Sequence, residues 1–446
     1  MKTTLPGFSK TCSSIGKMFL TIVLLFTIGA SFAAEQNYTD SWGKQGLSLN
    51  RQGSEGLNLN FSIQHFSFSD IDINGERMTS IEFSESFLPN ETGAPNLPGI
   101  SRKIAVPNGA TPVLEIVSMR TEHFSNMEIA PSPRIPLDTE RGPLSYNKDP
   151  EIYSRNSFYP AQPVELSEIN KMRGVDVCML NIQPYQYNPV TKELIVYRDI
   201  EINIRFVGGN GTFGEDRYRN RWWDSILEDA IFNFSSLPQI DYNQRSANNT
   251  RSTGYEYLII VPNDPVFSQW ADSIKKFRNE EGIYTGVVKL SDIGTSVSAA
   301  MLETYINTAY TTWDIPPVAV LLLGDFGQAS ANATTITSPI WDSYCVSDNI
   351  YADTDNDDMP EIIFARITAQ NASQLESMVG RFLKYERRPP TNPGFYANPI
   401  TALGWQTERW FQICSETVGG FWKNVLGKTP VRINEIYDGT PGSTWS

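Results

Sequence analysis

The stretch Tyr257-Leu258-Ile259-Ile260-Val261 is an uninterrupted apolar run, and the pattern of the chain changes there. A run of this length without polar alternation is typical of a strand that is buried on both faces. Asp264 follows as the cap of a predicted helix that begins with a proline and ends at Gly282. A second strand is predicted over 284–290 and a second helix over 296–313.

The same alternation of strands and helices continues to the last residues. It predicts strands over 318–323, from Ile362, over 400–403 and over 431–437, and helices over 371–387 and 408–426. Such alternation predicts an α/β domain, a mostly parallel sheet with helices on both faces, whose ligands bind beyond the carboxyl ends of the strands. The sequence has no glycine-rich phosphate-binding motif, so a nucleotide cofactor is not supported. Because no helix follows the last predicted strand, we expect the domain over 255–446 to be incomplete.

The first half of the chain shows short strand-like segments instead. Ile200, Ile202, Ile204 and Phe206 alternate with polar residues, which is the pattern of a half-buried strand. Proline-rich links separate the other short apolar runs, so we predict an all-β, sandwich-like domain over 34–235. A short amphipathic helix is predicted inside its last part, from Arg221 to Phe234.

A polar segment separates the two predicted domains. Residues 236–254 are rich in Asn, Ser and Gln, which is typical of an exposed linker. Arg245 and Arg251 lie within this segment, where a protease could reach the main chain. We therefore predict these two arginines as candidate sites of an activating cleavage.

Charge and the first residues limit the classes of partner and compartment. The formal net charge is −14 over 446 residues, and phosphate recognition needs clustered Lys and Arg, so nucleic acid is excluded as a partner. Three lysines, an apolar run from Met18 to Ile28, and Ser31-Phe32-Ala33 predict an export signal peptide over 1–33. The apolar run is too short for a permanent anchor. We expect a secreted or cell-surface protein with no transmembrane segment after signal cleavage.

An acidic loop over 347–361 precedes the predicted Ile362 strand. Asp353, Asp355 and Asp357 occupy alternate positions, as the first ligands of a calcium-binding loop do. Asp358 stands where such a loop has a glycine, and no glutamate follows at its twelfth position. Carboxylates at this density need either a bound cation or water and salt to offset their repulsion. The two interpretations are a Ca²⁺ site and a solvated acidic loop.

Short motifs in both halves resemble the precursors of gingipain-type cysteine peptidases, and they occur in the order of that family over most of residues 90–440. In the second half they are Leu321-Leu322-Leu323-Gly324-Asp325, Ser347-Asp348-Asn349-Ile350-Tyr351 with the acidic loop, and Ala365-Arg366-Ile367. In the first half they are Gly93-Ala94-Pro95-Asn96-Leu97-Pro98, Ile104-Ala105-Val106-Pro107 and Phe158-Tyr159-Pro160.

The resemblance implies a secreted zymogen of a cysteine endopeptidase. In it, a β-sandwich propeptide inhibits a caspase-like α/β domain that hydrolyses protein or peptide substrates. It also implies structural Ca²⁺, for which Asp353, Asp355 and Asp357 are the candidate ligands and Asp348 and Asp358 are further candidates.

The reaction of this family needs a Cys–His pair, in which a thiolate attacks the peptide carbonyl and an imidazole transfers the proton. In the family both residues follow the region of Tyr437-Asp438, so we expect the sequence to end before them. The only histidines are His65 and His123, in the first half. Cys345 and Cys414 therefore have no histidine in the α/β half, and lone cysteines usually pack as small apolar groups. We assign no catalytic residue and expect this polypeptide alone to be inactive.

Two other functions remain open. The predicted β-sandwich, the 12% aromatic content and the acidic loop also fit a calcium-dependent binding or adhesion protein of the cell surface, without catalysis. A periplasmic small-molecule binder would need a second α/β lobe, and the first half is β-rich. The residues after Ser446 distinguish the peptidase from the adhesion protein, because a Gly-His-Gly-type motif followed by a cysteine supports the peptidase.

Overall fold

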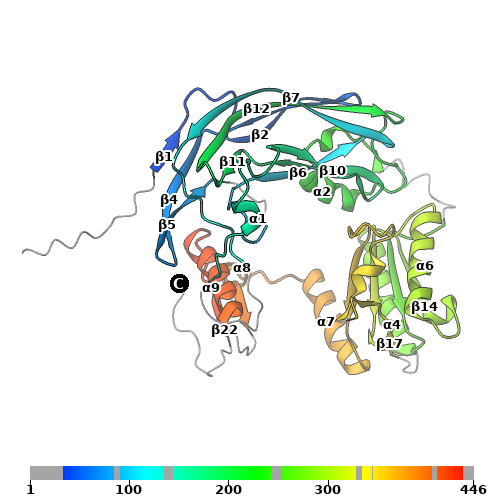
Figure 1. Ribbon diagram of the computed structural model, residues 1–446. Helices are drawn as coiled ribbons and strands as arrows, with labels where there is room; N and C mark the ends of the chain where they lie inside the picture. The colour runs from blue at the N-terminus through cyan, green and yellow to red at the C-terminus, as the bar shows by residue number, and fades with distance from the viewer. Residues whose placement is uncertain are drawn as a thin grey trace, which may run out of the picture.

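A computed structural model of the chain describes residues 34–84, 91–134, 144–242, 253–327, 334–343, 345–403 and 409–434. The predicted signal peptide and the candidate cleavage residues Arg245 and Arg251 lie outside the described residues. Figure 1 shows a strand-rich first half and, below it, a sheet flanked by helices. Among the helices of the described residues, none is both long enough and apolar enough to cross a membrane.

The strands of the first half pair antiparallel and form three sheets around one apolar core. One sheet has the order β1 (Ala34–Asn37), β4 (His65–Ile73), β5 (Glu76–Glu82). The second has the order β6 (Ile100–Val106), β10 (Val175–Ile182), β8 (Val164–Leu166), and β9 (Asn170–Met172) also pairs with β10. The third has the order β11 (Tyr185–Asn188), β12 (Glu193–Gly208), β3 (Gly56–Ser62), β2 (Gly46–Gly53), and β7 (Ala110–Phe124) also pairs with β12.

The long strand β12 carries the alternation that the sequence predicts. Ile200, Ile202 and Ile204 are fully buried in the core, while the residues between them are partly exposed. β12 begins earlier than the alternating pattern indicates, and its pairing with β7 shifts register between Tyr197 and Asp199. The strand-rich character of the first half, inferred from such patterns, is confirmed.

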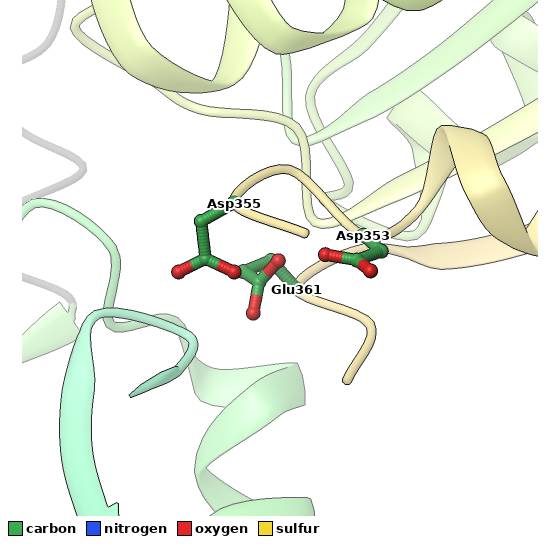
Figure 2. A group of neighbouring side chains, drawn as sticks. All are labelled: Asp353, Asp355 and Glu361. Atoms are coloured by element: carbon green, nitrogen blue, oxygen red, sulfur yellow. The ribbon is translucent and has the colours of Figure 1, made fainter. Parts of the chain in front are cut away.

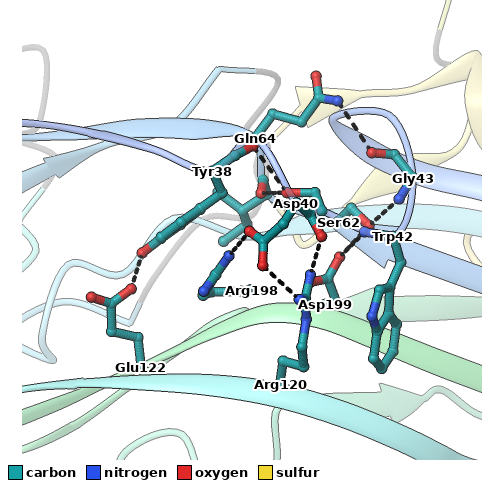
Figure 3. Close-up of polar contacts among 12 residues, drawn as sticks. Tyr38, Asp40, Trp42, Gly43, Ser62, Gln64, Arg120, Glu122, Arg198 and Asp199 are labelled. Carbon is teal, nitrogen blue, oxygen red and sulfur yellow. Dashed lines mark hydrogen bonds and ion pairs between the residues drawn. The ribbon is translucent and has the colours of Figure 1, made fainter.

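A buried carboxylate lies at this irregularity of β12. Asp199 accepts hydrogen bonds from the backbone of Trp42 at 2.8 Å and from the Ser62 hydroxyl at 2.7 Å. The Nε atom of Arg120, on β7, donates to the same carboxylate at 2.8 Å, and its Nη1 reaches Asp40 at 2.9 Å (Figure 3). The network therefore joins the segment before β2 to the strands β3, β7 and β12.

Short helices complete the first half. They are α1 (Pro150–Tyr153), α2 (Arg221–Ala230) and the 3-10 turn η1 (Phe234–Ser236). The predicted amphipathic helix is confirmed as α2, whose Asn220 cap accepts from the Trp222 backbone. Trp223 and Leu227 are buried in the core, whereas Trp222 is exposed, because it lies on the outer face of the helix.

The second half contains a four-stranded parallel sheet with the order β14-β13-β15-β20. Its strands are β13 (Tyr257–Val261), β14 (Thr285–Lys289), β15 (Ala319–Leu323) and β20 (Ile363–Ile367). The helices are α4 (Pro265–Glu280), α5 (Leu290–Ile293), α6 (Ala299–Thr312) and α7 (Ala372–Arg387). The Asp264 cap is confirmed, because its side chain accepts from the backbone of Val266 and Phe267.

Both faces of this sheet are covered. Leu258 and Ile260 of β13 belong to a core that also contains residues of α5 and α6. Their neighbours Ile259 and Val261 point to the opposite face, where they belong to a core with residues of α4 and α7. The apolar run 257–261 is therefore buried on both sides, as the sequence predicts.

Two groups of short elements complete the second half. Between β15 and β20 lie β16 (Asp325–Phe326), β17 (Thr335–Ile336), β18 (Ile340–Trp341), β19 (Cys345–Val346) and the 3-10 turn η2 (Asp348–Tyr351). After α7 come α8 (Pro393–Ala397), β21 (Ile400–Leu403), α9 (Arg409–Asn424) and β22 (Val431–Asn434). The strands β21 and β22 form their own two-stranded parallel sheet, apart from the four-stranded sheet that the pattern predicted them to join.

Candidate metal centre

The acidic loop runs from η2 to β20 and is organised by Asp353. Its carboxylate accepts hydrogen bonds from the backbone of Asn356 at 2.7 Å and of Asp358 at 3.0 Å. Asn356 and Asp358 have φ angles of 63° and 67°, in the left-handed region that favours glycine but that Asn and Asp also adopt. Asp358 thus takes the backbone conformation for which a glycine was expected at this position.

Three carboxylates converge within this loop. Asp353, Asp355 and Glu361 each offer an oxygen atom, and these oxygens lie within 4.8 Å of one another. Figure 2 shows the carboxylates of Asp353 and Asp355 on either side of Glu361. We call these three residues the acidic triad. Two of its members are sequence-predicted ligands, and the third, Glu361, was not among the candidates although it lies just before the predicted strand.

Glu361 is the buried member of the triad, with 1% of its surface exposed. Its Oε2 accepts from the Thr354 backbone at 2.9 Å and from the Thr354 hydroxyl at 3.1 Å. Its Oε1 is buried without a hydrogen-bond partner. The pKa of Glu361 is raised to about 7, chiefly by burial and in part by the charges of Asp355 and Asp357, while the Thr354 bonds oppose the shift. A buried acceptor without a partner is costly, and a cation would satisfy it.

Asp355 has the same electrostatic problem in a more exposed place. Desolvation raises its pKa, and the neighbouring carboxylates of Asp357 and Asp353 raise it further. Carboxylate oxygens are the ligands that hard divalent cations such as Ca²⁺ and Mg²⁺ prefer. Three converging carboxylates, one of them with an unsatisfied buried oxygen, fit such an ion.

The other three predicted ligands have different neighbours. Asp357 accepts from the Met359 backbone at 2.9 Å and, through its other oxygen, from the Lys171 backbone at 2.8 Å. Asp358 is exposed beside the triad. Asp348 forms a two-point ion pair with Arg366, with Nε–Oδ2 at 2.7 Å and Nη2–Oδ1 at 2.8 Å. The triad therefore brings together only part of the predicted set.

Arg366 fixes the start of the acidic loop to the sheet. It projects from β20 and, besides its pair with Asp348, donates to the carbonyl oxygens of Gly324 at 3.1 Å and Ile336 at 2.9 Å. These carbonyls follow β15 and lie on β17. One side chain thus holds η2, the end of β15 and β17 in a fixed relation.

The described cysteines and histidines lie on separate strands and helices. Cys178 is buried in β10, and burial raises its pKa to about 11. Cys345 and Cys414 are exposed, so the expectation that Cys414 packs is wrong. His65 and His123 lie on β4 and β7, and His123 contacts Glu193 at 2.8 Å. The α/β half contains no histidine.

Two family models match the chain in sequence order. Residues 46–237 match Propeptide_C25, and residues 250–439 match Peptidase family C25. Among curated proteins, Lys-gingipain HG66 of Porphyromonas gingivalis is 23% identical over 371 residues, which are 78% of this chain and 20% of that protein. Gingipain R2 of the same organism is 25% identical over 316 residues, 69% of this chain and 40% of that protein. The chain spans about a fifth of the length of the Lys-gingipains that it matches.

Solved structures give a partial likeness. A complex of the pro- and mature domains of RgpB from Porphyromonas gingivalis has 24% sequence identity and a TM-score of 0.38, over 42% of this chain and 97% of that chain. A structure concerning the zymogenic latency of gingipain K from the same organism has 23% identity and a TM-score of 0.34, over 40% of this chain and 99% of that chain.

Proposed function

The chain belongs to peptidase family C25, the gingipain-type cysteine peptidases with their propeptide, and on that premise we propose that it is part of an exported cysteine endopeptidase zymogen. The observation that carries the proposal is the ordered match of a propeptide model and a peptidase model to the two halves. The fold changes between these matches, from antiparallel strands to a parallel sheet with helices on both faces.

In this proposal each half has its own task. The first half inhibits the peptidase until the linker is cut, and residues 1–33 direct export to the cell surface or medium. The second half supplies the caspase-like peptidase fold for protein or peptide substrates. The carboxyl ends of its strands are where ligands bind to sheets of this class.

The proposed chemistry is peptide hydrolysis through a cysteine thiolate, with a histidine that transfers the proton to the leaving amine. The α/β half within these 446 residues contains no histidine. We therefore propose that this polypeptide by itself hydrolyses no peptide, before or after the linker is cut. Turnover that disappears in Cys345→Ala or Cys414→Ala would contradict this, because it would assign the nucleophile within the chain.

The coding sequence beyond residue 446 tests the peptidase proposal directly. We expect a Gly-His-Gly-type motif followed by a cysteine, and peptide hydrolysis by the longer protein that is lost when that cysteine is replaced by alanine. A stop codon at this point, or a longer protein that remains inert to peptides after cleavage at the linker, would favour the calcium-dependent adhesion protein instead.

We further propose that the acidic triad binds a structural divalent cation, with Ca²⁺ as the ion. Asp353, Asp355 and Glu361 would hold it, and the buried Oε1 of Glu361 supports this set. The ion would supply positive charge that offsets the repulsion of the carboxylates and fixes the loop before β20.

Thermal unfolding with Ca²⁺ tests the cation site. An ion that binds only the folded state stabilises it by about 2.7 kcal/mol at a hundredfold excess over its dissociation constant, so the midpoint should rise. Glu361→Gln should abolish most of the rise, because it removes the buried charge. Asp358→Asn, which changes an exposed neighbour, should retain it. A rise that is equal in all three proteins, or absent from the natural chain, would leave the solvated acidic loop as the interpretation.

A further inference from the structure

A two-residue hairpin turn of the first half projects into the second half. It joins β9 to β10, where Met172 pairs with Val175, so Arg173 and Gly174 form the turn. Their φ angles are 50° and 75°, as in the hairpin turns that favour Asn-Gly. A Cβ atom at Gly174 would lie 2.5 Å from the Tyr218 ring, so only glycine fits there. Arginine is a poor residue for the first position, and local preference does not explain it.

The contacts of Arg173 explain its presence in the turn. Its side chain is among the largest fully buried ones of the described residues. Nε donates to the Tyr218 carbonyl at 2.8 Å, within the first half. Nη1 donates across to the second half, to the carbonyl oxygens of Pro317 at 2.8 Å and Glu361 at 3.0 Å. The guanidinium also lies over an aromatic ring from each half, 5.8 Å from that of Trp223 and 5.0 Å from that of Tyr310.

The positive charge of Arg173 is stabilised by main-chain carbonyl groups and aromatic rings. Burial lowers its pKa to about 10, while the neighbouring Tyr310 and Glu361 oppose the shift, so it remains charged at neutral pH. A buried charge is stable only where every donor finds an acceptor. Two of the three carbonyl acceptors of Arg173, those of Pro317 and Glu361, belong to the second half, so separation of the halves would leave the guanidinium without them.

Neighbouring contacts extend the same surface. The Lys171 backbone donates to Asp357 in the acidic loop at 2.8 Å. The Trp223 indole donates to the Val318 carbonyl at 3.3 Å, and Val318 belongs to the apolar core of the first half. Between the hairpin and α2, Arg217 also donates to the carbonyls of Tyr310 at 3.2 Å and Trp313 at 3.1 Å, so the hairpin is one part of a wider contact.

This surface lies at the amino-terminal edge of the parallel sheet. Pro317 and Glu361 each lie two residues before a strand, β15 and β20, whereas Gly324 follows β15 at the opposite edge. Ligands of such sheets bind at the carboxyl edge. The contact made by Arg173 is thus separate from the edge at which substrate is expected, and it can hold the first half without occupying that edge.

We propose that the hairpin of residues 170–175, through Arg173, is the docking element that keeps the first half on the α/β half after the linker between them has been cut. Cleavage of the chain and departure of the first half are then two separate events. The inference rests on the proposed function only in taking the linker as the place of the cut, and its test measures association of the halves, not hydrolysis.

The test uses the full chain with a recognition sequence for a specific protease placed within residues 243–252. After the cut, size-exclusion chromatography and a dissociation constant report whether the halves stay together. Arg173→Met removes the donors and keeps most of the side-chain length. Truncating one partner of a buried hydrogen-bonded charge typically weakens association by roughly thirtyfold or more. Arg205→Met, at an exposed arginine of β12, is the matched control and should retain the natural affinity.

A second variant approaches the contact from the other side. Tyr310→Leu removes the ring of α6 that lies under the guanidinium and also stacks on Tyr218 of the first half. Tyr305→Leu on the same helix is its control, because Tyr305 packs on Trp313. We expect Tyr310→Leu to weaken association and Tyr305→Leu to leave it unchanged. If Arg173→Met prevents folding of the uncut chain, the comparison of Tyr310→Leu with Tyr305→Leu tests the proposal in its place. Unchanged association in Arg173→Met, or in Tyr310→Leu where it decides, overturns the proposal.

Discussion

Arg173 and Glu361 join the two halves of the molecule at 3.0 Å, between a guanidinium nitrogen and a main-chain carbonyl oxygen. The side chain of the same Glu361 is the buried carboxylate of the acidic triad. One residue therefore faces the hairpin of the first half with its backbone and the candidate cation site with its side chain. A change in the hairpin contact is therefore expected to affect the candidate cation site, and a change in the cation site to affect the hairpin contact.

The stability of the α/β half should decrease as pH rises from about 4 to about 7 when divalent cations are removed. The pKa of Glu361 is raised to about 7 in the folded protein, whereas an unfolded chain titrates near the ordinary value of about 4.3. Between these values the folded state holds a proton that the unfolded state has released, so stability is lost as that proton leaves. The loss is at most about 4 kcal/mol. Urea unfolding in a chelator, followed across this pH range, measures it.

Glu361→Gln provides the control for this pH dependence. Glutamine does not titrate, so the decrease should become shallower, and what remains would come from Asp355, whose pKa is raised in the same direction. Glu376→Gln, at an exposed glutamate of α7, should leave the natural slope. The same slope in Glu361→Gln as in the natural chain would assign the titration to another group.

The buried network at Asp199 should make a large contribution to the stability of the first half. Asp199→Ala leaves the guanidinium of Arg120 without its buried partner and the Ser62 hydroxyl without its acceptor. Breaking a buried pair from one side typically costs about 3–5 kcal/mol. Glu201→Ala, two residues along β12 and only partly buried, should cost much less. Urea unfolding of both variants measures the difference, and equal losses would show that burial of Asp199 carries no special weight.

Arg366→Met should loosen the acidic loop from the sheet. The variant leaves Asp348 without its cation and the carbonyls of Gly324 and Ile336 without a donor. We expect a loss of about 3 kcal/mol and faster amide hydrogen exchange between η2 and β20. Arg366→Lys keeps the positive charge but loses the planar guanidinium that makes the two-point pair. It should therefore recover part of the lost stability. Exchange in the loop that does not change would show that Arg366 does not hold it.

Local pattern was sufficient to predict the main strands and helices at several places in both halves. The apolar run 257–261, the Asp264 cap and the alternation at Ile200 each fix a local conformation, and the structure has the corresponding strand and helix at each place. Helices on both faces follow from the same logic, since residues buried on both sides of a strand need two covers. These features depend on residues that are close in the sequence, so a single sequence contains the signal for them.

Features that depend on distant residues were not predictable. Glu361 joins Asp353 and Asp355 only because the loop folds back, and its spacing does not match the expected calcium loop. Arg173 is an ordinary charged residue in the sequence, and its burial depends on carbonyls more than 140 residues away. The separate pairing of β21 with β22 was likewise not predictable, because the hydrophobic pattern of a strand does not show which other strand it pairs with. A charged residue in a turn that prefers Asn-Gly was the one available signal for the hairpin.

Calcium should weaken the hold of the first half on the second. Lys171 and Arg173 bring two positive charges to the acidic loop, where the Lys171 charge lowers the pKa of Asp355 and so attracts it. A divalent ion in the triad would place further positive charge beside them, and like charges repel. In the cut chain we expect the dissociation constant of the halves to rise about tenfold with Ca²⁺ relative to chelator, or about 1.4 kcal/mol, at matched ionic strength. Glu361→Gln should remove this dependence, because it weakens the cation site and leaves the Glu361 carbonyl in place. Tighter association with Ca²⁺ would instead mean that the ordered loop docks the hairpin better, and that ordering outweighs repulsion.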